Sequence, residues 1–147
     1  MKEDQSDLMG RTFESDEAFL VTAERIANFC ASVGEDNPLY LDAIAAQNGP
    51  HGGIVAPPAF VASFRYADNV FQQVPAFSHG GLMAGIDFEI DAPIRAGDSI
   101  QVASRVKEIY EKTGRTGSMV FVIVRSTLKN QNGEVVAHVD HRFMNRT

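Results

Sequence analysis

The sequence predicts an α+β fold in which a long antiparallel β-sheet wraps around a buried helix. Apolar residues have a helical spacing after Thr22, and a second apolar stretch begins at Pro57-Pro58. From Ile86 onward they repeat with a period of two, which is typical of strands. A long helix that is apolar around much of its circumference needs a large curved sheet to bury it. An ordinary α+β sandwich, with the helix packed on one face, is the alternative.

The composition is that of a globular protein, and we expect one domain, residues 1–147, with residues 1–10 flexible. The formal net charge of -6 argues against a nucleic-acid partner, which would require a basic patch. The single cysteine, Cys30, cannot form an internal disulfide and favours a reducing compartment. The sequence contains no apolar run long enough to span a membrane and no signal-peptide pattern at its start, so we expect a cytoplasmic protein without a membrane partner.

The first helix is predicted to begin after Thr22, a plausible N-cap, and to end at Gly34. Its apolar face is expected to carry Ile26, Phe29, Cys30 and Val33. Asn37-Pro38 then indicates a tight loop, and residues 41–47 are expected to form a short second helix.

The most apolar helix is predicted from about Ala59 to Phe71, because Pro57-Pro58 suits the first turn of a helix, where a missing N–H costs nothing. Six glycines and prolines lie between Gly49 and Pro58, immediately before it. A flexible loop that leads into a buried helix is a natural entrance for a ligand. A plain crossover loop is the alternative.

The strand half begins with Ile86, Phe88 and Ile90, which alternate with acidic residues and predict a half-buried strand. A turn at residues 96–98 leads to a long strand, and residues 113–117 predict a hairpin. The continuous apolar run from Met119 to Val124 suits a central strand covered on both faces. Asn132-Gly133 predicts a two-residue hairpin turn. The last strand is expected to place Val135, Ala137, Val139 and Phe143 on one face and His138, Asp140 and Arg142 on the other.

Three segments together resemble the MaoC-like dehydratase/hydratase family, in its N-terminal FAS1-like dehydratase type. They are Val33-Gly34-Glu35-Asp36-Asn37-Pro38-Leu39-Tyr40-Leu41-Asp42, Gly53 to Phe60, and Phe88-Glu89 with the Ala92–Ser99 turn. The resemblance covers roughly residues 10–145. It implies a hot-dog fold, in which the antiparallel sheet wraps around a long central helix. It also implies dimerisation through the sheets and a substrate that is an acyl-CoA or acyl-ACP thioester.

Active members of that family carry an aspartate at the position of Glu35 and a histidine at the position of Tyr40. Hydration of an enoyl thioester needs a base that activates water and an acid that protonates the α-carbon. A tyrosine, with an ordinary pKa near 10, is a poor partner for that base. The family's oxyanion donor, a glycine N–H, matches Pro58, which has no N–H, although the N–H of Ala59 could partly replace it.

These departures lead us to expect the non-catalytic, substrate-accommodating subunit of a paired (R)-specific enoyl hydratase. Its expected partners are the thioester and either a second copy or a catalytic MaoC-like subunit; no metal or cofactor is expected. A self-sufficient hydratase that uses Glu35 and Tyr40, and a non-enzymatic module that binds a hydrophobic ligand, are the alternatives. The residues expected to contact substrate are Asn37, Gly53, Val55, Ala56, Pro57, Pro58, Ala59 and His79.

The remaining polar candidates have simpler explanations beside the functional one. His51 and His79 adjoin glycines and are either near the ligand or solvated loop residues. His138 is expected to be exposed, and His141 to be buried or at an interface. Three arginines, Arg115, Arg125 and Arg142, are candidates for a rim that binds coenzyme A phosphates.

Overall fold

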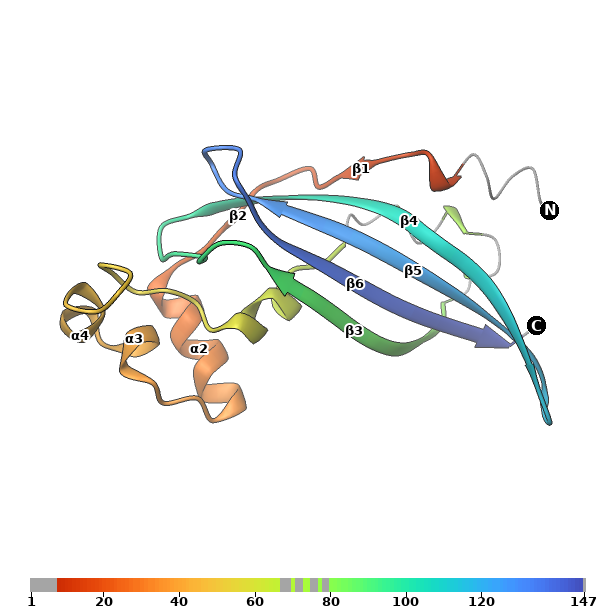
Figure 1. Cartoon of the computed structure of the whole chain (residues 1–147), viewed down its shortest axis with the longest axis horizontal. Helices are drawn as coiled ribbons and strands as arrows, with labels where there is room; N and C mark the ends of the chain where they lie inside the picture. Colours follow the sequence, from red (N-terminus) through yellow and green to blue (C-terminus); the bar gives the residue numbers. More distant parts are fainter. Residues whose placement is uncertain (1–7, 67–69, 71–72, 75–76, 78–79, 147) are drawn as a thin grey trace.

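The computed structural model describes residues 8–66, 70, 73–74, 77 and 80–146, and its main feature is a twisted antiparallel β-sheet (Figure 1). The strand order is β1-β4-β5-β6-β3, and β2 also pairs with β4. The strands are β1 Phe13–Glu14, β2 Phe19–Leu20, β3 Leu82–Ile90, β4 Ser99–Gly114, β5 Gly117–Lys129 and β6 Val135–Arg146. The helices are α2 Ala23–Val33, α3 Pro38–Leu41, α4 Ala43–Gln47 and the 3₁₀ helix η1 Pro58–Ser63. Figure 1 shows α2, α3 and α4 gathered at one end of the sheet, opposite the tip of the β4–β5 hairpin.

Strand β5 lies between β4 and β6, which confirms the central position predicted for its apolar run. Val122 and Val124 are fully buried, and Ile123, on the opposite face, is nearly so. The β4–β5 hairpin turns at residues 115–116 and continues through Gly117, whose φ of 118° favours glycine. We call the face of the sheet that carries Val124 and His141 the inner face, and the face that carries Arg125 and Asp140 the outer face.

The β5–β6 turn is one residue longer than predicted. Asn130 N–H donates to the Glu134 carbonyl at 3.0 Å, so three residues rather than two separate the hydrogen-bonded pair. Gly133 adopts a left-handed φ of 76°, as expected in a three-residue hairpin with a bulge. The Asn130 side chain accepts from the N–H groups of Asn132 and Glu134, which stabilises this longer turn.

Strand β3 lies at the edge of the sheet and pairs with β6 alone. Ile86 is half-buried, whereas Phe88 and Ile90 are 42% and 40% exposed. The predicted alternation is present, but the predicted burial is incomplete because little in the described part of the chain covers the edge strand.

Helix α2 begins and ends where the sequence predicts. The Thr22 side chain accepts from Arg25 N–H at 3.1 Å, and Gly34 ends the helix with a φ of 75°. Ile26 and Cys30 are fully buried. The expectation for Val33 was wrong: it lies in the last turn, beyond the edge of the core, and is 58% exposed.

Within the described residues, the helix predicted over residues 59–71 is wrong in length and type; residues 67–69 and 71–72 lie outside the described part of the chain. The chain forms the 3₁₀ helix η1, which ends at Ser63, and Phe64 is extended with a ψ of 124°. Its hydrogen bonds, such as Phe64 N–H to the Val61 carbonyl at 3.2 Å, span three residues. Phe60, Val61 and Phe64 are all buried against the sheet. Packing of these large side chains, which are weak helix formers, therefore decides the local backbone.

Residues 38–47 form two short helices rather than the single one predicted over residues 41–47. Asp42 ends α3, and its carboxylate caps α4 by accepting from the N–H groups of Ile44 and Ala45. None of the helices in the part of the chain that the structure describes is long and apolar enough to cross a membrane.

Candidate functional site

The loop that matches the family's catalytic motif uses its polar side chains to build its own turn. The Glu35 carboxylate accepts from Asn37 N–H at 3.1 Å. The Asn37 side chain in turn accepts from Leu39 N–H at 3.0 Å and caps α3. Both acceptors are therefore engaged with the backbone, and the loop positions Tyr40 on α3.

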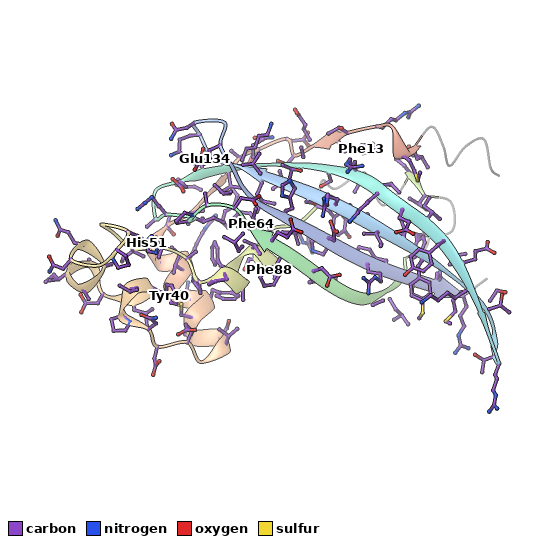
Figure 2. All side chains as sticks on the ribbon, in the orientation of Figure 1. Phe13, Tyr40, His51, Phe64, Phe88 and Glu134 are labelled. Carbon is purple, nitrogen blue, oxygen red and sulfur yellow. The ribbon has the colours of Figure 1, made fainter. Side chains whose placement is uncertain are left out.

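A pocket of about 300 Å³, the smaller pocket, lies between this helical end and the edge of the sheet. Three segments line it: the helix α3, the glycine- and proline-rich part of the crossover (residues 49–58) with η1, and the end of β3 with the loop that follows it. The lining residues are Tyr40, His51, Val55, Ala56, Pro57, Pro58, Val61, Ile90, Asp91, Ala92, Pro93 and Ile94. Figure 2 shows Tyr40 and His51 at the helical end of the molecule.

The smaller pocket brings together several of the residues predicted to contact substrate. Tyr40 and the run from Val55 to Pro58 line it, whereas Glu35, Asn37, Gly53 and Ala59 do not. His79 lies outside the described residues. The pocket therefore brings part of the predicted set together, and contact of these residues with substrate stays a prediction.

The crossover is fixed to the turn after β3 by backbone hydrogen bonds. Ala56 N–H donates to the Ile94 carbonyl at 2.8 Å, and Ala96 N–H donates to the Ile54 carbonyl at 3.0 Å. The Arg95 guanidinium binds the His51 carbonyl, which holds this histidine at the pocket. Sequence reasoning missed Arg95 because the contact joins residues 44 positions apart.

The titratable groups of the smaller pocket are Tyr40, His51 and Asp91, of which Asp91 was not predicted. The Asp91 carboxylate and His138 Nδ1 are hydrogen-bonded at 3.0 Å, and both side chains are partly exposed. The sequence predicted an exposed His138; in the structure its side chain is only partly exposed, because it pairs with Asp91. In the described part of the chain no cluster of three or more His, Cys, Asp or Glu side chains could hold a metal ion.

A second pocket, the larger pocket, has a volume of about 590 Å³ and lies where η1 ends. The N-terminal segment that includes β1 and β2 forms one wall, and residues 63–66 form another. Its lining residues are Glu14, Ser15, Asp16, Glu17, Phe19, Ser63, Phe64, Arg65, Tyr66 and Val102. The N-terminal wall is anchored by the Gln101 amide, which donates to the Ser15 carbonyl at 2.7 Å.

The three arginines proposed as a phosphate rim do not form one. Arg125 donates to Asp140 at 2.8 Å, and Arg142 donates to Asp87 at 3.1 Å, both on the outer face. Arg115 lies in the turn of the β4–β5 hairpin, at the end of the sheet far from the helices (Figure 1). The rim prediction was wrong because Arg115 lies far from the other two, and Arg125 and Arg142 each pair with an aspartate on the outer face.

The sheet, the crossover and the pocket beside it define a hot-dog protein of the MaoC-like class. The crystal structure of a MaoC-like dehydratase from Rhodospirillum rubrum superposes with a TM-score of 0.72 and 26% identity, over 96% of this chain and 94% of that one. The HadBC (3R-hydroxyacyl-ACP dehydratase) complex from Mycobacterium tuberculosis supports the same fold, with a TM-score of 0.75 and 24% identity over 95% and 98%.

Residues 7–139 match the family model of the FAS1-like dehydratase domain region, and the chain belongs to this family. A UPF0336 protein of Streptomyces griseus is 31% identical over 90% of this chain and 88% of its own length. A probable enoyl-CoA hydratase alpha subunit of Thermomonospora curvata is 28% identical over 80% of this chain and 42% of its own length. These matches confirm the family and the fold that the motif implied.

Proposed function

We propose that this chain is the substrate-accommodating, non-catalytic subunit of a paired (R)-specific enoyl hydratase that acts on acyl-CoA or acyl-ACP thioesters. The observation that carries this proposal is the state of the catalytic positions. Of the two catalytic positions, only Tyr40 lines the smaller pocket. The Glu35 carboxylate does not line it and accepts a hydrogen bond from the turn backbone instead. Pro58 has no N–H to offer an oxyanion. We therefore expect the acid–base pair, worth roughly 100- to 10,000-fold in rate, to come from a partner.

The two pockets suit the two parts of an acyl thioester. The smaller pocket lies at the start of η1 and the larger one at its end. Six residues at a rise of about 2.0 Å each place these ends about 12 Å apart. The thioester would occupy the smaller pocket, and the body of the acyl group would occupy the larger one.

Strand β3 offers a surface for the partner. It is an unpaired edge that exposes Leu82, Met83, Phe88 and Ile90 in the single chain. An apolar edge strand of this kind is a site for association, because it leaves hydrogen-bonding groups and apolar area uncovered. The relatives whose names describe a complex or a subunit support a heteromeric partner.

The test measures loss of the enoyl absorbance of trans-2-enoyl-CoA thioesters. We expect no turnover from the chain alone, and turnover after addition of a MaoC-like subunit that carries the aspartate–histidine pair. Phe88→Lys should weaken association with that subunit and leave the fold intact, because this side chain is 42% exposed. Failure to bind any acyl-CoA and any MaoC-like subunit would overturn the proposal.

A self-sufficient hydratase is the second candidate, because Tyr40 does line the smaller pocket, together with His51 and Asp91. It requires turnover by the chain alone. If Glu35 and Tyr40 are the acid–base pair, Glu35→Gln and Tyr40→Phe should each abolish this turnover. An unaffected rate would instead make Asp91 and His51 the candidate acid and base. Binding of a hydrophobic ligand without turnover, even with partners added, would instead favour a non-enzymatic module.

A further inference from the structure

One buried polar side chain on the inner face is not satisfied. The buried polar residues of the described part are Asp98, Ser104, Ser126 and His141. The hydroxyls of Ser104 and Ser126 share a hydrogen bond at 2.7 Å, and Asp98 accepts from Arg95 N–H and from Gln131. His141 is only 4% exposed, yet its Nδ1 has no hydrogen-bond partner within the described part. A buried polar atom in this state costs free energy and is rare in folded proteins.

The surroundings of His141 keep it neutral. Its ring packs against those of Tyr66 and Phe143, with ring centroids 5.5 Å and 6.2 Å away, and its strand neighbours are Ile86 and Val124. Burial lowers the pKa of His141 below its usual 6.5, although the charge of Asp140 acts in the opposite direction. Near neutral pH the side chain is therefore a neutral imidazole, which can donate one hydrogen bond and accept another.

Tyr66 connects this imidazole to the larger pocket. Tyr66 lines that pocket and also packs edge-on against His141. The lining is mixed: Phe19, Phe64 and Val102 are apolar, and the other residues beside Tyr66 are polar or charged. Figure 2 labels Phe64, which is buried in the hydrophobic core. A ligand in this pocket therefore meets both apolar and polar groups, and His141 lies behind Tyr66 rather than in the lining.

The charges around the larger pocket select against an anionic ligand. Three carboxylates, Glu14, Asp16 and Glu17, face one guanidinium, Arg65. All four side chains are exposed, so salt screens their electrostatic effect on a ligand, but their net charge is negative. A second carboxylate at the far end of an acyl chain is disfavoured here, whereas a neutral polar group meets no such repulsion.

We propose that His141 recognises a neutral oxygen, a keto or hydroxyl group, on the body of the acyl group bound in the larger pocket. This inference rests on the proposed function, because it assumes that the acyl body lies in that pocket. Because His141 does not itself line the pocket, the Tyr66 side chain has to rotate for the oxygen to reach Nδ1. The imidazole donates to a keto oxygen in one tautomer and accepts from a hydroxyl in the other.

The experiment compares three probes that differ only in the distal half of the chain. They are palmitoyl-CoA, a series of oxopalmitoyl-CoAs with the carbonyl at successive distal positions, and the CoA monothioester of hexadecanedioic acid. Binding is measured by calorimetry, with the catalytic subunit present where the chain alone does not bind. We expect one oxo isomer to bind about threefold to tenfold more tightly than palmitoyl-CoA, as one added hydrogen bond provides, and the diacid to bind more weakly than either.

Two matched variants separate recognition from packing. His141→Asn keeps a hydrogen-bonding group near the position of Nδ1, and His141→Phe removes it while keeping an aromatic ring. We expect the oxo preference to persist in the asparagine variant and to disappear in the phenylalanine variant, with palmitoyl-CoA affinity little changed in both. Because either variant could fold poorly, the ¹⁵N chemical shift of the His141 imidazole in the unaltered protein gives a second readout. It should move with the preferred oxo ligand and not with palmitoyl-CoA.

The outcomes distinguish this inference from the function on which it rests. Equal affinity for palmitoyl-CoA and every oxo isomer, or an imidazole shift that does not respond, would overturn the role of His141 and leave the proposed function intact. Binding of none of the probes, with and without the catalytic subunit, would overturn both.

Discussion

The sheet and the crossover segment, residues 35–66, use polar side chains in different ways. In the sheet, charged residues pair with one another on the outer face, as Arg125 and Lys107 do with Asp140. In the crossover, Glu35, Asn37 and Asp42 accept hydrogen bonds from backbone N–H groups and hold short helices and turns. The ion pairs keep the charges of the sheet on its outer face, and the backbone hydrogen bonds give the crossover a defined shape with a pocket at each end of η1. We therefore expect variants of the buried sheet residues to change stability most, and variants of the exposed and turn-forming residues of the crossover to change it less.

The largest effect should come from the core of the sheet. Leu128 on β5 is fully buried, and Leu128→Ala should lower the free energy of unfolding by about 2–5 kcal/mol, because it leaves a cavity. Ile44→Ala in α4 is the matched control: Ile44 is 74% exposed, and its loss should cost less than about 0.5 kcal/mol. Urea denaturation measures both. Equal losses would mean that the crossover carries as much of the stability as the sheet.

The outer-face ion pairs should rank second. Burial acts to raise the pKa of Asp140, but hydrogen bonds from Arg125 and Lys107 outweigh it and lower the pKa below 3.8. Asp140→Asn should therefore cost about 1–2 kcal/mol at neutral pH. Because the folded pKa is lowered, the contribution is present above pH 3.8 and is lost as the pH falls further. Asp87→Asn, which removes an exposed pair with Arg142, should cost less than about 0.5 kcal/mol.

The crossover turn provides a smaller effect and a test of residue roles. Asn37→Ala removes the cap of α3 and should cost about 1 kcal/mol in denaturation experiments. The affinity for acyl-CoA should stay unchanged, because Asn37 does not line the smaller pocket. If the variant loses affinity for acyl-CoA while its melting behaviour is unaltered, Asn37 contacts the substrate.

The smallest effect concerns pH. The pKa of His141 is lowered by burial, so the unfolded state takes up a proton more readily than the folded state. Stability should therefore decrease as the pH falls below about 6.5, the ordinary pKa of histidine. His141→Phe should remove this part of the pH dependence, whereas the loss that follows protonation of Asp140 should remain. A variant with an unchanged profile near pH 6 would show that another group titrates there.

Local signals in the sequence predicted much of this molecule. Thr22 and Gly34 bound α2 because capping chemistry depends on a few neighbouring residues. The alternation from Ile86 and the apolar run of β5 predicted the strands, because side-chain period follows directly from backbone geometry. The family motif implied a catalytic position at Tyr40 and substrate contact at Val55; the structure places both in the lining of the smaller pocket, and their roles stay predictions.

Tertiary structure decided the features that depend on distant partners. The chain after Pro58 is apolar on most sides, which is compatible with a long helix. Packing of Phe60 and Phe64 onto the sheet instead gives one short 3₁₀ helix and an extended continuation. Arg95 reaches His51 only after the sheet has formed, and Asp91 meets His138 across 47 residues. Patterns within a window of a few residues carry no information about such contacts, because their free energy comes from groups that only the folded chain brings together.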